Sequence, residues 1–276
     1  MSPLLCLAAI AAGPTPPIMR ERQIGPPTEI TGGKVTELNV GDLKATLFVP
    51  DGYRAPRKPE VWIHFHSAPW FVVSEYQRAK WRTPVVICNF GQGSTVYGKP
   101  FTEIGSFRAW REQIDAALGK PTQQWGITSF SAGFGAVRNL IQDPALASQL
   151  KTVILADSLY GSLDPAVTTE RKPLPAHLSI WDPIVQPAIA GKMTVIMTTT
   201  QITPETYAGT WEVARGLVEK SGGTMREETA STEEFALLRT YQKGRWFVWS
   251  YNGITPMAHM THPRHLAELL IESQRR

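Results

Sequence analysis

The chain has 276 residues, with 28 Lys or Arg against 24 Asp or Glu and a net charge of +4. Hydrophobic residues make up 42% and aromatic residues 9%, which is typical of a soluble globular domain and excludes disorder, collagen and coiled coil. The basic residues are scattered in short groups, so nucleic-acid binding is not indicated. With only two cysteines, Cys6 and Cys88, the sequence excludes a cysteine-built metal site and a disulfide framework.

The N-terminal residues predict a leader ahead of the folded domain. Residues 1–13 are apolar and end in small residues, and residues 9–11 match the A-x-A pattern of a signal-peptide cleavage site. We therefore expect export to the periplasm or the extracellular space, the alternative being a cytoplasmic protein with a loosely packed N-terminal arm. The Pro-rich stretch up to residue 27 is expected to be extended, which leaves 28–276 as one domain. No apolar run approaches the ~20 residues needed to span a bilayer.

The folded part begins with a hairpin pattern and continues as strands alternating with helices. Two alternating runs are joined by Gly41 and Asp42, which indicates an antiparallel hairpin. Buried apolar runs separated by helical segments then favour an α/β fold, with a mostly parallel sheet covered by helices on both faces. The expected strands are 34–40, 43–49, 61–65, 84–90, 125–130, 152–156, 193–197 and 246–251; the expected helices are 101–118, 132–141, 207–219 and 263–273.

The stretch 161–191 interrupts this alternation. It is rich in proline, contains Trp181 and is too long for an ordinary connection. We expect a cap-like or lid-like insertion over the C-terminal edge of the sheet, where α/β proteins bind their ligands.

Ser131 is the strongest candidate for a nucleophile. It follows an expected strand and opens an expected helix, in the sequence S-F-S-A-G, which is a G-x-S-x-G nucleophile elbow with Ser129 in place of the first glycine. The tight turn requires small neighbours, and Ser129 and Gly133 meet that need. The backbone N–H groups at the start of the helix suit a developing oxyanion. The alternative is that Ser131 only caps the helix.

A serine nucleophile needs a base, and histidines follow the last expected strand. His259 lies first, in the expected loop directly after that strand, and is preferred. His262 precedes a proline and is expected to begin the final helix, while His265 would lie inside it. His262 remains the alternative base, and His177 lies in the insertion.

The base in turn needs a carboxylate to orient it. Asp157 ends the strand after the elbow, at the ligand-binding edge of the sheet, and is preferred. The next strand ends in T-T-T-Q, with no carboxylate until Glu205. Asp182 and Glu205 therefore remain as alternatives.

The loop after the first parallel strand, H-F-H-S-A-P-W, is the candidate for the second half of an oxyanion hole. Backbone N–H groups of Ser67 or Ala68 would act together with that of Ala132. His64 and His66 are two residues apart, but no Cys, Asp or Glu accompanies them, so we expect them to hold this loop and not a metal.

Together these parts resemble the α/β-hydrolase superfamily, in particular bacterial serine hydrolases of poorly assigned substrate. The resemblance rests on H-F-H-S, on S-F-S-A-G-F-G-A-V-R, on the strand-end Asp157 and on the late His259, and it extends from about residue 60 to the end. A further similarity to a less-studied subgroup rests on F-G-Q-G-S-T-V-Y, A-D-S-L-Y-G and A-H-M-T-H. It implies that Asp157 is the acid. Ser129, Ser67 in place of an oxyanion-loop glycine, and the missing acid after the penultimate strand depart from the wider pattern.

We therefore expect a serine acyl hydrolase, most simply a carboxylic-ester hydrolase, that acts on a small-molecule ester without a cofactor. Trp70, Trp181 and Phe134 are candidates for lining an apolar acyl pocket. A serine peptidase or amidase would use the same triad, and an esterase acting on polysaccharide fits the many tryptophans and the expected export. A non-catalytic binding protein on the same fold is the alternative of another class. The sequence does not determine the oligomeric state.

Overall fold

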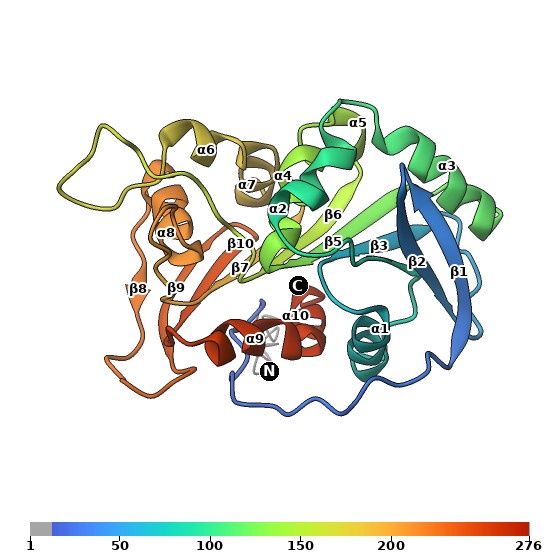
Figure 1. Cartoon of the computed structure of the whole chain (residues 1–276), viewed down its shortest axis with the longest axis horizontal. Coiled ribbons are helices and arrows are strands. Elements are labelled where there is room, and N and C mark those ends of the chain that lie inside the picture. Colours follow the sequence, from blue (N-terminus) through green and yellow to red (C-terminus); the bar gives the residue numbers. More distant parts are fainter. Residues whose placement is uncertain (1–12, 276) are drawn as a thin grey trace, which may run out of the picture.

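The computed structural model describes residues 13–275, so the cleavage-site pattern at residues 9–11 and Cys6 lie outside the described part. The described chain forms a ten-stranded sheet with helices on both faces (Figure 1). Its strands are β1 (Gly33–Val40), β2 (Leu43–Pro50), β3 (Glu60–Phe65), β4 (Val85–Cys88), β5 (Gln124–Phe130), β6 (Leu150–Ala156), β7 (Thr194–Thr199), β8 (Arg226–Glu227), β9 (Leu237–Lys243) and β10 (Trp246–Tyr251). Their order in the sheet is β1-β2-β4-β3-β5-β6-β7-β10-β9-β8.

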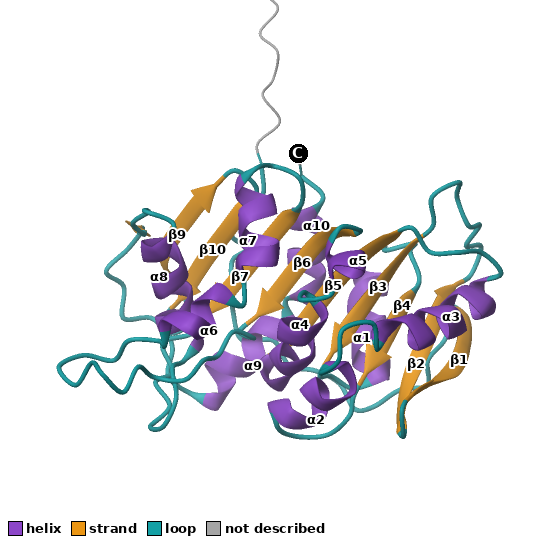
Figure 2. Cartoon of the chain, turned by 90° about the horizontal axis from the view of Figure 1, so that it is seen from above, coloured by secondary structure: helices purple, strands orange, loops and turns teal. Residues whose placement is uncertain are grey.

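The centre of the sheet is parallel and both of its edges are antiparallel. Strands β4, β3, β5, β6, β7 and β10 run parallel to one another, while β1 and β2 form the expected N-terminal hairpin. The predicted fold class is therefore confirmed. The opposite edge was not predicted: β9 pairs antiparallel with β10, and β8 with β9 (Figure 2). Gly244, with φ +61°, lies in the tight turn that joins β9 to β10.

Helices cover the two faces of the sheet unequally. In Figure 1, α1, α9 and α10 lie on one face and the remaining helices on the other. Helix α1 was not predicted, and the helix expected at 101–118 begins only at Phe107. The helices are α1 (Pro69–Arg78), α2 (Ser94–Gly98), α3 (Phe107–Leu118), α4 (Phe134–Leu140), α5 (Pro144–Ala147), α6 (Pro175–Ser179), α7 (Asp182–Ile189), α8 (Thr210–Lys220), α9 (Pro256–Arg264) and α10 (Leu266–Ser273), with 3-10 turns η1 (Lys99–Phe101) and η2 (Ser131–Gly133).

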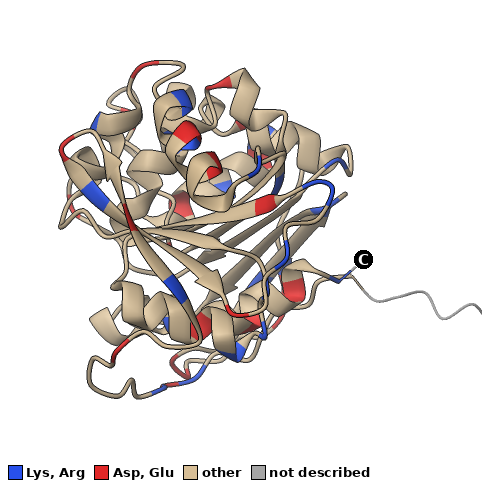
Figure 3. Cartoon of the chain, turned by 90° about the vertical axis from the view of Figure 1, so that its right-hand side faces the viewer, with Lys and Arg blue, Asp and Glu red and all other residues tan. Residues whose placement is uncertain are grey.

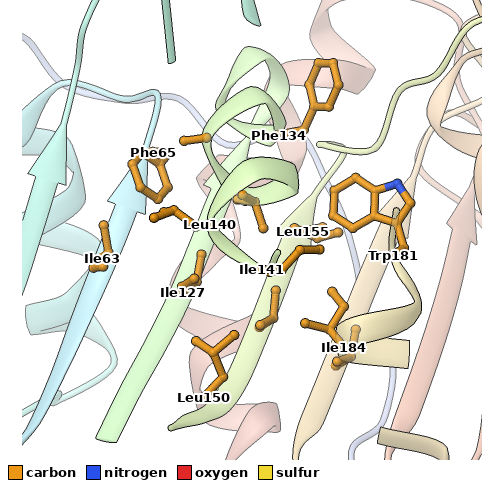
Figure 4. Packing of buried hydrophobic residues seen from close by; sticks show 14 of the residues in the cluster. Ile63, Phe65, Ile127, Phe134, Leu140, Ile141, Leu150, Leu155, Trp181 and Ile184 are labelled. Atoms are coloured by element: carbon orange, nitrogen blue, oxygen red, sulfur yellow. The ribbon is translucent and has the colours of Figure 1, made fainter. Parts of the chain in front are cut away.

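Each central strand buries side chains on both faces, because alternate residues point to opposite sides of a sheet. On β3, Val61 and Ile63 belong to the cluster beneath α4 and α7, while Trp62 belongs to the cluster beneath α1 and α10. Figure 4 shows the first cluster, with side chains of β3, β5 and β6 packed against α4 and α7. Burial on both faces explains why these strands read as continuous apolar runs.

The C-terminal helix expected at 263–273 is divided in the structure. Helix α9 ends at Arg264, α10 begins at Leu266, and His265 lies between them instead of inside one helix. Pro263 lacks a backbone N–H, which weakens the helix just where the break occurs. His262 is consequently the seventh residue of α9 and not the start of a helix.

The segment 161–191 combines a projecting loop with helices that pack into the body. Figure 1 shows the loop before α6 extending beyond α8, in yellow. Helix α7 instead buries Ile184, Val185 and Ala188 in the core. Trp181, expected to line a substrate pocket, is 1% exposed and packs in the same core cluster, so that prediction is wrong.

The Pro-rich leader runs along the face covered by α1 and α10. Arg22 Nη1 lies 2.5 Å from Glu75 Oε1, and Arg78 Nη2 lies 2.6 Å from Glu75 Oε2. The backbone N–H of Ala267, in the first turn of α10, donates to Glu75 at 3.2 Å. Glu75 is fully buried, so one carboxylate joins the leader, α1 and α10.

No helix within residues 13–275 is long and apolar enough to cross a membrane.

Figure 3 shows Lys and Arg interspersed with Asp and Glu over the side of the molecule next to the β1–β2 hairpin.

Replacing Glu75 with Ala should lower the free energy of unfolding by about 2–3 kcal/mol. Arg22 then loses its carboxylate, Arg78 keeps only Glu268, and the backbone N–H of Ala267 loses its acceptor. Urea denaturation measures this loss. The matched control is Glu37→Ala, which breaks the exposed pair with Lys44 and should cost less than about 1 kcal/mol. Equal effects of the two substitutions would contradict a structural role for the buried carboxylate.

Candidate active site

Ser131 occupies a strained turn between β5 and α4. Its φ of +47° lies in the left-handed region, which non-glycine residues rarely adopt. Gly133 is required just beyond it, since a Cβ there would lie 2.6 Å from the carbonyl oxygen of Phe65. Ser131 also begins the short helix η2, whose first backbone N–H groups have no partner within the helix. The strand–turn–helix geometry expected for a nucleophile elbow is thus present.

Ser129, which replaces the usual glycine, has a structural use. Its hydroxyl is fully buried and donates to the Ser158 hydroxyl at 2.8 Å. The Ser158 hydroxyl in turn donates to the carbonyl of Ser131 at 2.9 Å. This chain of hydrogen bonds ties the elbow to the end of β6. In the sequence analysis Ser158 appeared only within A-D-S-L-Y-G and was given no role of its own.

Asp157 and His259 form a short contact at the C-terminal edge of the sheet. Nδ1 of His259 lies 2.6 Å from Oδ2 of Asp157. Asp157 follows β6 with φ +46° and is fully buried, whereas the His259 side chain is 20% exposed. The sequence expected His259 in a loop, but it lies in α9, in the turn that follows the Thr255 cap. One ring nitrogen thus contacts the carboxylate and the other is left free for a second partner.

Two threonines complete the surroundings of Asp157. The backbone N–H of Thr200 donates to Oδ1 at 2.9 Å and its hydroxyl donates to Oδ2 at 3.0 Å. The hydroxyl of Thr210 also donates to Oδ1. Neither threonine was singled out in the sequence, because T-T-T-Q reads as an ordinary strand end and Thr210 as the start of a helix.

The hydrogen bonds outweigh the cost of burying this carboxylate. Burial alone would raise the pKa of Asp157, but hydrogen bonds from His259 and Thr210, together with the charge of nearby His262, hold that pKa below its usual value. Asp157 is therefore an anion at neutral pH and favours the Nδ1–H tautomer of His259.

The alternative acids and bases lie elsewhere. Glu205 is exposed, and Asp182 pairs with Lys220 at 2.6 Å. His262 is 2% exposed, and its Nδ1 lies 2.7 Å from the hydroxyl of Thr198. His265 Nδ1 lies 3.0 Å from the carbonyl of Thr261. None of these four side chains lines the cavity described next.

A cavity of about 590 Å³ contains both Ser131 and His259. Ala132, expected as an oxyanion donor, and Phe134, expected as a pocket residue, line it too. The Ser131 hydroxyl and the His259 ring, both within the described chain, are not hydrogen bonded to each other. The hydroxyl of Tyr160, which also lines the cavity, donates to the backbone carbonyl of Asp157 at 3.4 Å. Burial raises the pKa of Tyr160, and the charge of Asp157 raises it further. The remaining lining residues are Gly93, Ser94, Arg138, Tyr160, Gly161, Ser162, His177, Ile202, Pro204 and Tyr207.

The loop after β3 lines a second, more apolar cavity of about 340 Å³. Ser67, Ala68 and Trp70 belong to its wall, and none of the three lines the Ser131 cavity. Trp70 is therefore not part of the pocket in which it was expected, while the expected oxyanion role of the Ser67 and Ala68 backbone stays a prediction. The ring of His66 is stacked on Phe130 with 5.7 Å between centroids, and Phe130 lies 4.4 Å from the ring of His259. His66 and Phe130 line the second cavity and His259 lines the first, so this row of three rings lies between the two cavities.

His64 and His66 are each held by a hydroxyl. Nδ1 of His64 lies 2.8 Å from the hydroxyl of Thr128, and Nδ1 of His66 lies 2.8 Å from that of Tyr97. Burial lowers the pKa of His64 to about 3, with a further contribution from His66. Within residues 13–275 no group of three His, Cys, Asp or Glu side chains is arranged to hold a metal ion.

Comparison with known proteins identifies the fold. No protein-family model and no curated protein sequence matches the chain. Among solved structures, LpqC, a poly(3-hydroxybutyrate) depolymerase from Bordetella parapertussis, is 15% identical with a TM-score of 0.51, over 90% of this chain and 92% of its own. A feruloyl esterase module from Clostridium thermocellum is 11% identical with a TM-score of 0.50, over 89% and 90%. EstE1, a thermostable carboxylesterase from a metagenomic library, is 12% identical with a TM-score of 0.50, over 90% of both chains. The chain therefore has the α/β-hydrolase fold.

His262 should make the protein less stable in mild acid. Burial lowers the pKa of His262 from 6.5 to about 4. Between these pH values His262 is protonated in the unfolded chain but not in the folded chain. Stability is therefore lost as pH falls from 6.5 to 4. His262→Gln should flatten the slope of unfolding free energy against pH in this window by up to about 1.4 kcal/mol per pH unit. Urea denaturation at several pH values measures it; the partly exposed His177→Gln is the control, and parallel curves for His262→Gln and the parent protein would refute the assignment.

Proposed function

We propose that the protein is a serine acyl hydrolase that cleaves carboxylic esters, with Ser131 as nucleophile, His259 as base and Asp157 as the orienting acid. The observation that carries the proposal is the 2.6 Å contact between His259 Nδ1 and a buried, ionised Asp157. His259 also lines the same cavity as Ser131, whose φ is left-handed. Burying a carboxylate costs free energy unless hydrogen bonds or a partner group compensate its charge. Here the partner is His259, a histidine that also lines the cavity, and buried ionised groups of this kind are common in active sites.

In the proposed mechanism Nε2 of His259 removes the hydroxyl proton of Ser131 as the oxygen attacks the acyl carbon. The tetrahedral intermediate collapses when His259 returns that proton to the departing alcohol, leaving an acyl-serine. Water, deprotonated by His259, then releases the acid and restores Ser131. The Ser131 hydroxyl first has to turn towards His259, because the two are not hydrogen bonded in the structure. Catalytic hydrogen bonds are often unformed in the free enzyme.

The oxyanion would be stabilised by the backbone N–H of Ala132, at the start of η2, and by an N–H from the loop at Ser67 and Ala68. The left-handed φ of +72° at His66 bends this loop at the end of β3, next to the elbow. Hydrogen bonds from His66 to Tyr97 and from the backbone N–H of Phe90 to the same Tyr97 hydroxyl support the bend.

The choice of esters over amides is supported by the proteins that share the fold. The three matched structures are described as a poly(3-hydroxybutyrate) depolymerase, a feruloyl esterase module and a carboxylesterase. Each of these names refers to hydrolysis of an ester of a carboxylic acid. We infer the same reaction class for this chain.

A fluorophosphonate probe should label the protein at Ser131 alone. Such a probe reacts with serines that a base and oxyanion donors activate, so Ser131→Ala should abolish the adduct and the hydrolysis of para-nitrophenyl acetate while leaving thermal unfolding unchanged. Peptide mass spectrometry locates the adduct. Ser162→Ala, in the same cavity, is the control and should be labelled like the parent protein. A folded protein without an adduct would instead favour non-catalytic binding.

Asp157→Asn should lower kcat/KM for para-nitrophenyl acetate by about three to four orders of magnitude, since Asn cannot stabilise the imidazolium or select its tautomer. Steady-state kinetics measure the loss. Glu205→Gln, which alters the exposed alternative acid, should leave kcat/KM unchanged. A large loss in Glu205→Gln with little loss in Asp157→Asn would reverse the assignment of the acid.

A further inference from the structure

Arg138 lies in the wall of the Ser131 cavity, seven residues further along the chain. Helix α4 begins at Phe134, three residues after Ser131, and Arg138 lies in its second turn. At about 2.0 Å per residue in the 3-10 turn and 1.5 Å in the α-helix, the two residues are roughly 10–12 Å apart along this stretch. Arginine side chains on a helix lean towards its N-terminus, and the guanidinium carbon lies 5.5 Å from the ring centroid of Phe134. The positive charge is therefore displaced from its own Cα back towards the nucleophile.

This guanidinium has no anionic partner in the described part of the chain. No carboxylate of residues 13–275 lies within 4.0 Å of it, although Arg78, Arg171 and Arg239 each have such a partner. No Asp or Glu lines the cavity either. Asp157 is fully buried, and its two oxygens already accept from Thr200, Thr210 and His259.

The rest of the wall complements the charge. Phe134, Tyr160 and Tyr207 form a continuous aromatic surface, with ring centroids 5.2 Å and 5.8 Å apart. His177 Nδ1 accepts the backbone N–H of Ser162 at 2.9 Å, so its neutral ring carries the proton on Nε2 as a further donor. The same cavity thus contains Ser131 and His259, an aromatic wall, and a guanidinium without an anionic partner.

We propose that Arg138 recognises a carboxylate on the substrate, so that the enzyme prefers esters with an anionic group some 5–10 Å from the scissile carbonyl, since the guanidinium leans back from its own Cα towards Ser131. This inference rests on the proposed function. The apolar chain between ester and carboxylate would lie along Phe134 and Tyr160. A guanidinium without a partner can form a bidentate pair with such a carboxylate at no cost in broken ion pairs.

The test compares charged and neutral esters of equal length. The charged probes are mono-para-nitrophenyl esters of hexanedioic, octanedioic and decanedioic acids, and the neutral probes carry a primary amide in place of the free carboxylate. A second series, acetate esters of ω-hydroxy acids of the same lengths, tests for a carboxylate in the alcohol part. The parent protein should favour the charged member in one of the two series, and rising ionic strength should reduce that preference.

Arg138→Gln should lower kcat/KM for the favoured charged esters by about 10- to 100-fold, mainly through KM, and change the neutral esters less than about twofold. Arg138→Lys should retain part of the preference, because the charge remains but the planar fork is lost. Arg108→Gln, which removes an exposed arginine from α3 outside the cavity, is the control and should alter neither series. Equal loss for charged and neutral esters, or no loss in either series, would overturn the inference.

A binding measurement separates this inference from the proposed function. Calorimetric titration with octanedioate should show binding to the Ser131→Ala protein that is lost when Arg138→Gln is added. If esters are hydrolysed but neither kinetics nor binding depends on Arg138, the anion site is wrong and the hydrolase stands. If no ester is hydrolysed and yet octanedioate binds through Arg138, the hydrolase is wrong and the anion site stands.

Discussion

The site depends on one buried charge, the carboxylate of Asp157. An ion of this kind is tolerated inside a protein only when hydrogen bonds replace its water, and three separate segments supply them here. Thr200 comes from the end of β7, Thr210 from the start of α8 and His259 from α9. The ends of these elements are therefore held around one point, and His259 has a fixed orientation before any ligand binds.

The sheet determines why these groups meet. β5 and β6 are adjacent parallel strands, and each is directly followed by a residue with left-handed φ, Ser131 after β5 and Asp157 after β6. Both residues leave the plane of the sheet at the same edge, and the hydrogen bonds of Ser158 join the two turns. Strain at the two turns is sustained because the strands behind them are buried on both faces.

Much of this arrangement can be predicted from the sequence, and each part that could not be predicted has an identifiable physical reason. Apolar runs gave the parallel strands, and a small-residue turn with a strand-end aspartate indicated Ser131 and Asp157. Thr200 and Thr210 carry no signal, since threonine is common in strands and at helix starts. Strand β9, next to the edge strand β8, was not predicted because its side chains are only partly buried and show no apolar run. Trp181 was misjudged because composition does not distinguish a core aromatic from a pocket aromatic.

The two charged side chains nearest Ser131, Asp157 and Arg138, have opposite surroundings. Asp157 is buried with every oxygen satisfied, so its charge acts only on His259. Arg138 is partly exposed in the cavity wall, over the ring of Phe134, with no carboxylate beside it within residues 13–275. Phe134 begins the short helix α4, which directly follows the turn at Ser131 and carries Arg138. One continuous stretch of chain thus fixes the separation of the proposed nucleophile and this cation, and under our proposal this makes the cavity selective for the length of an anionic ester as well as for its charge.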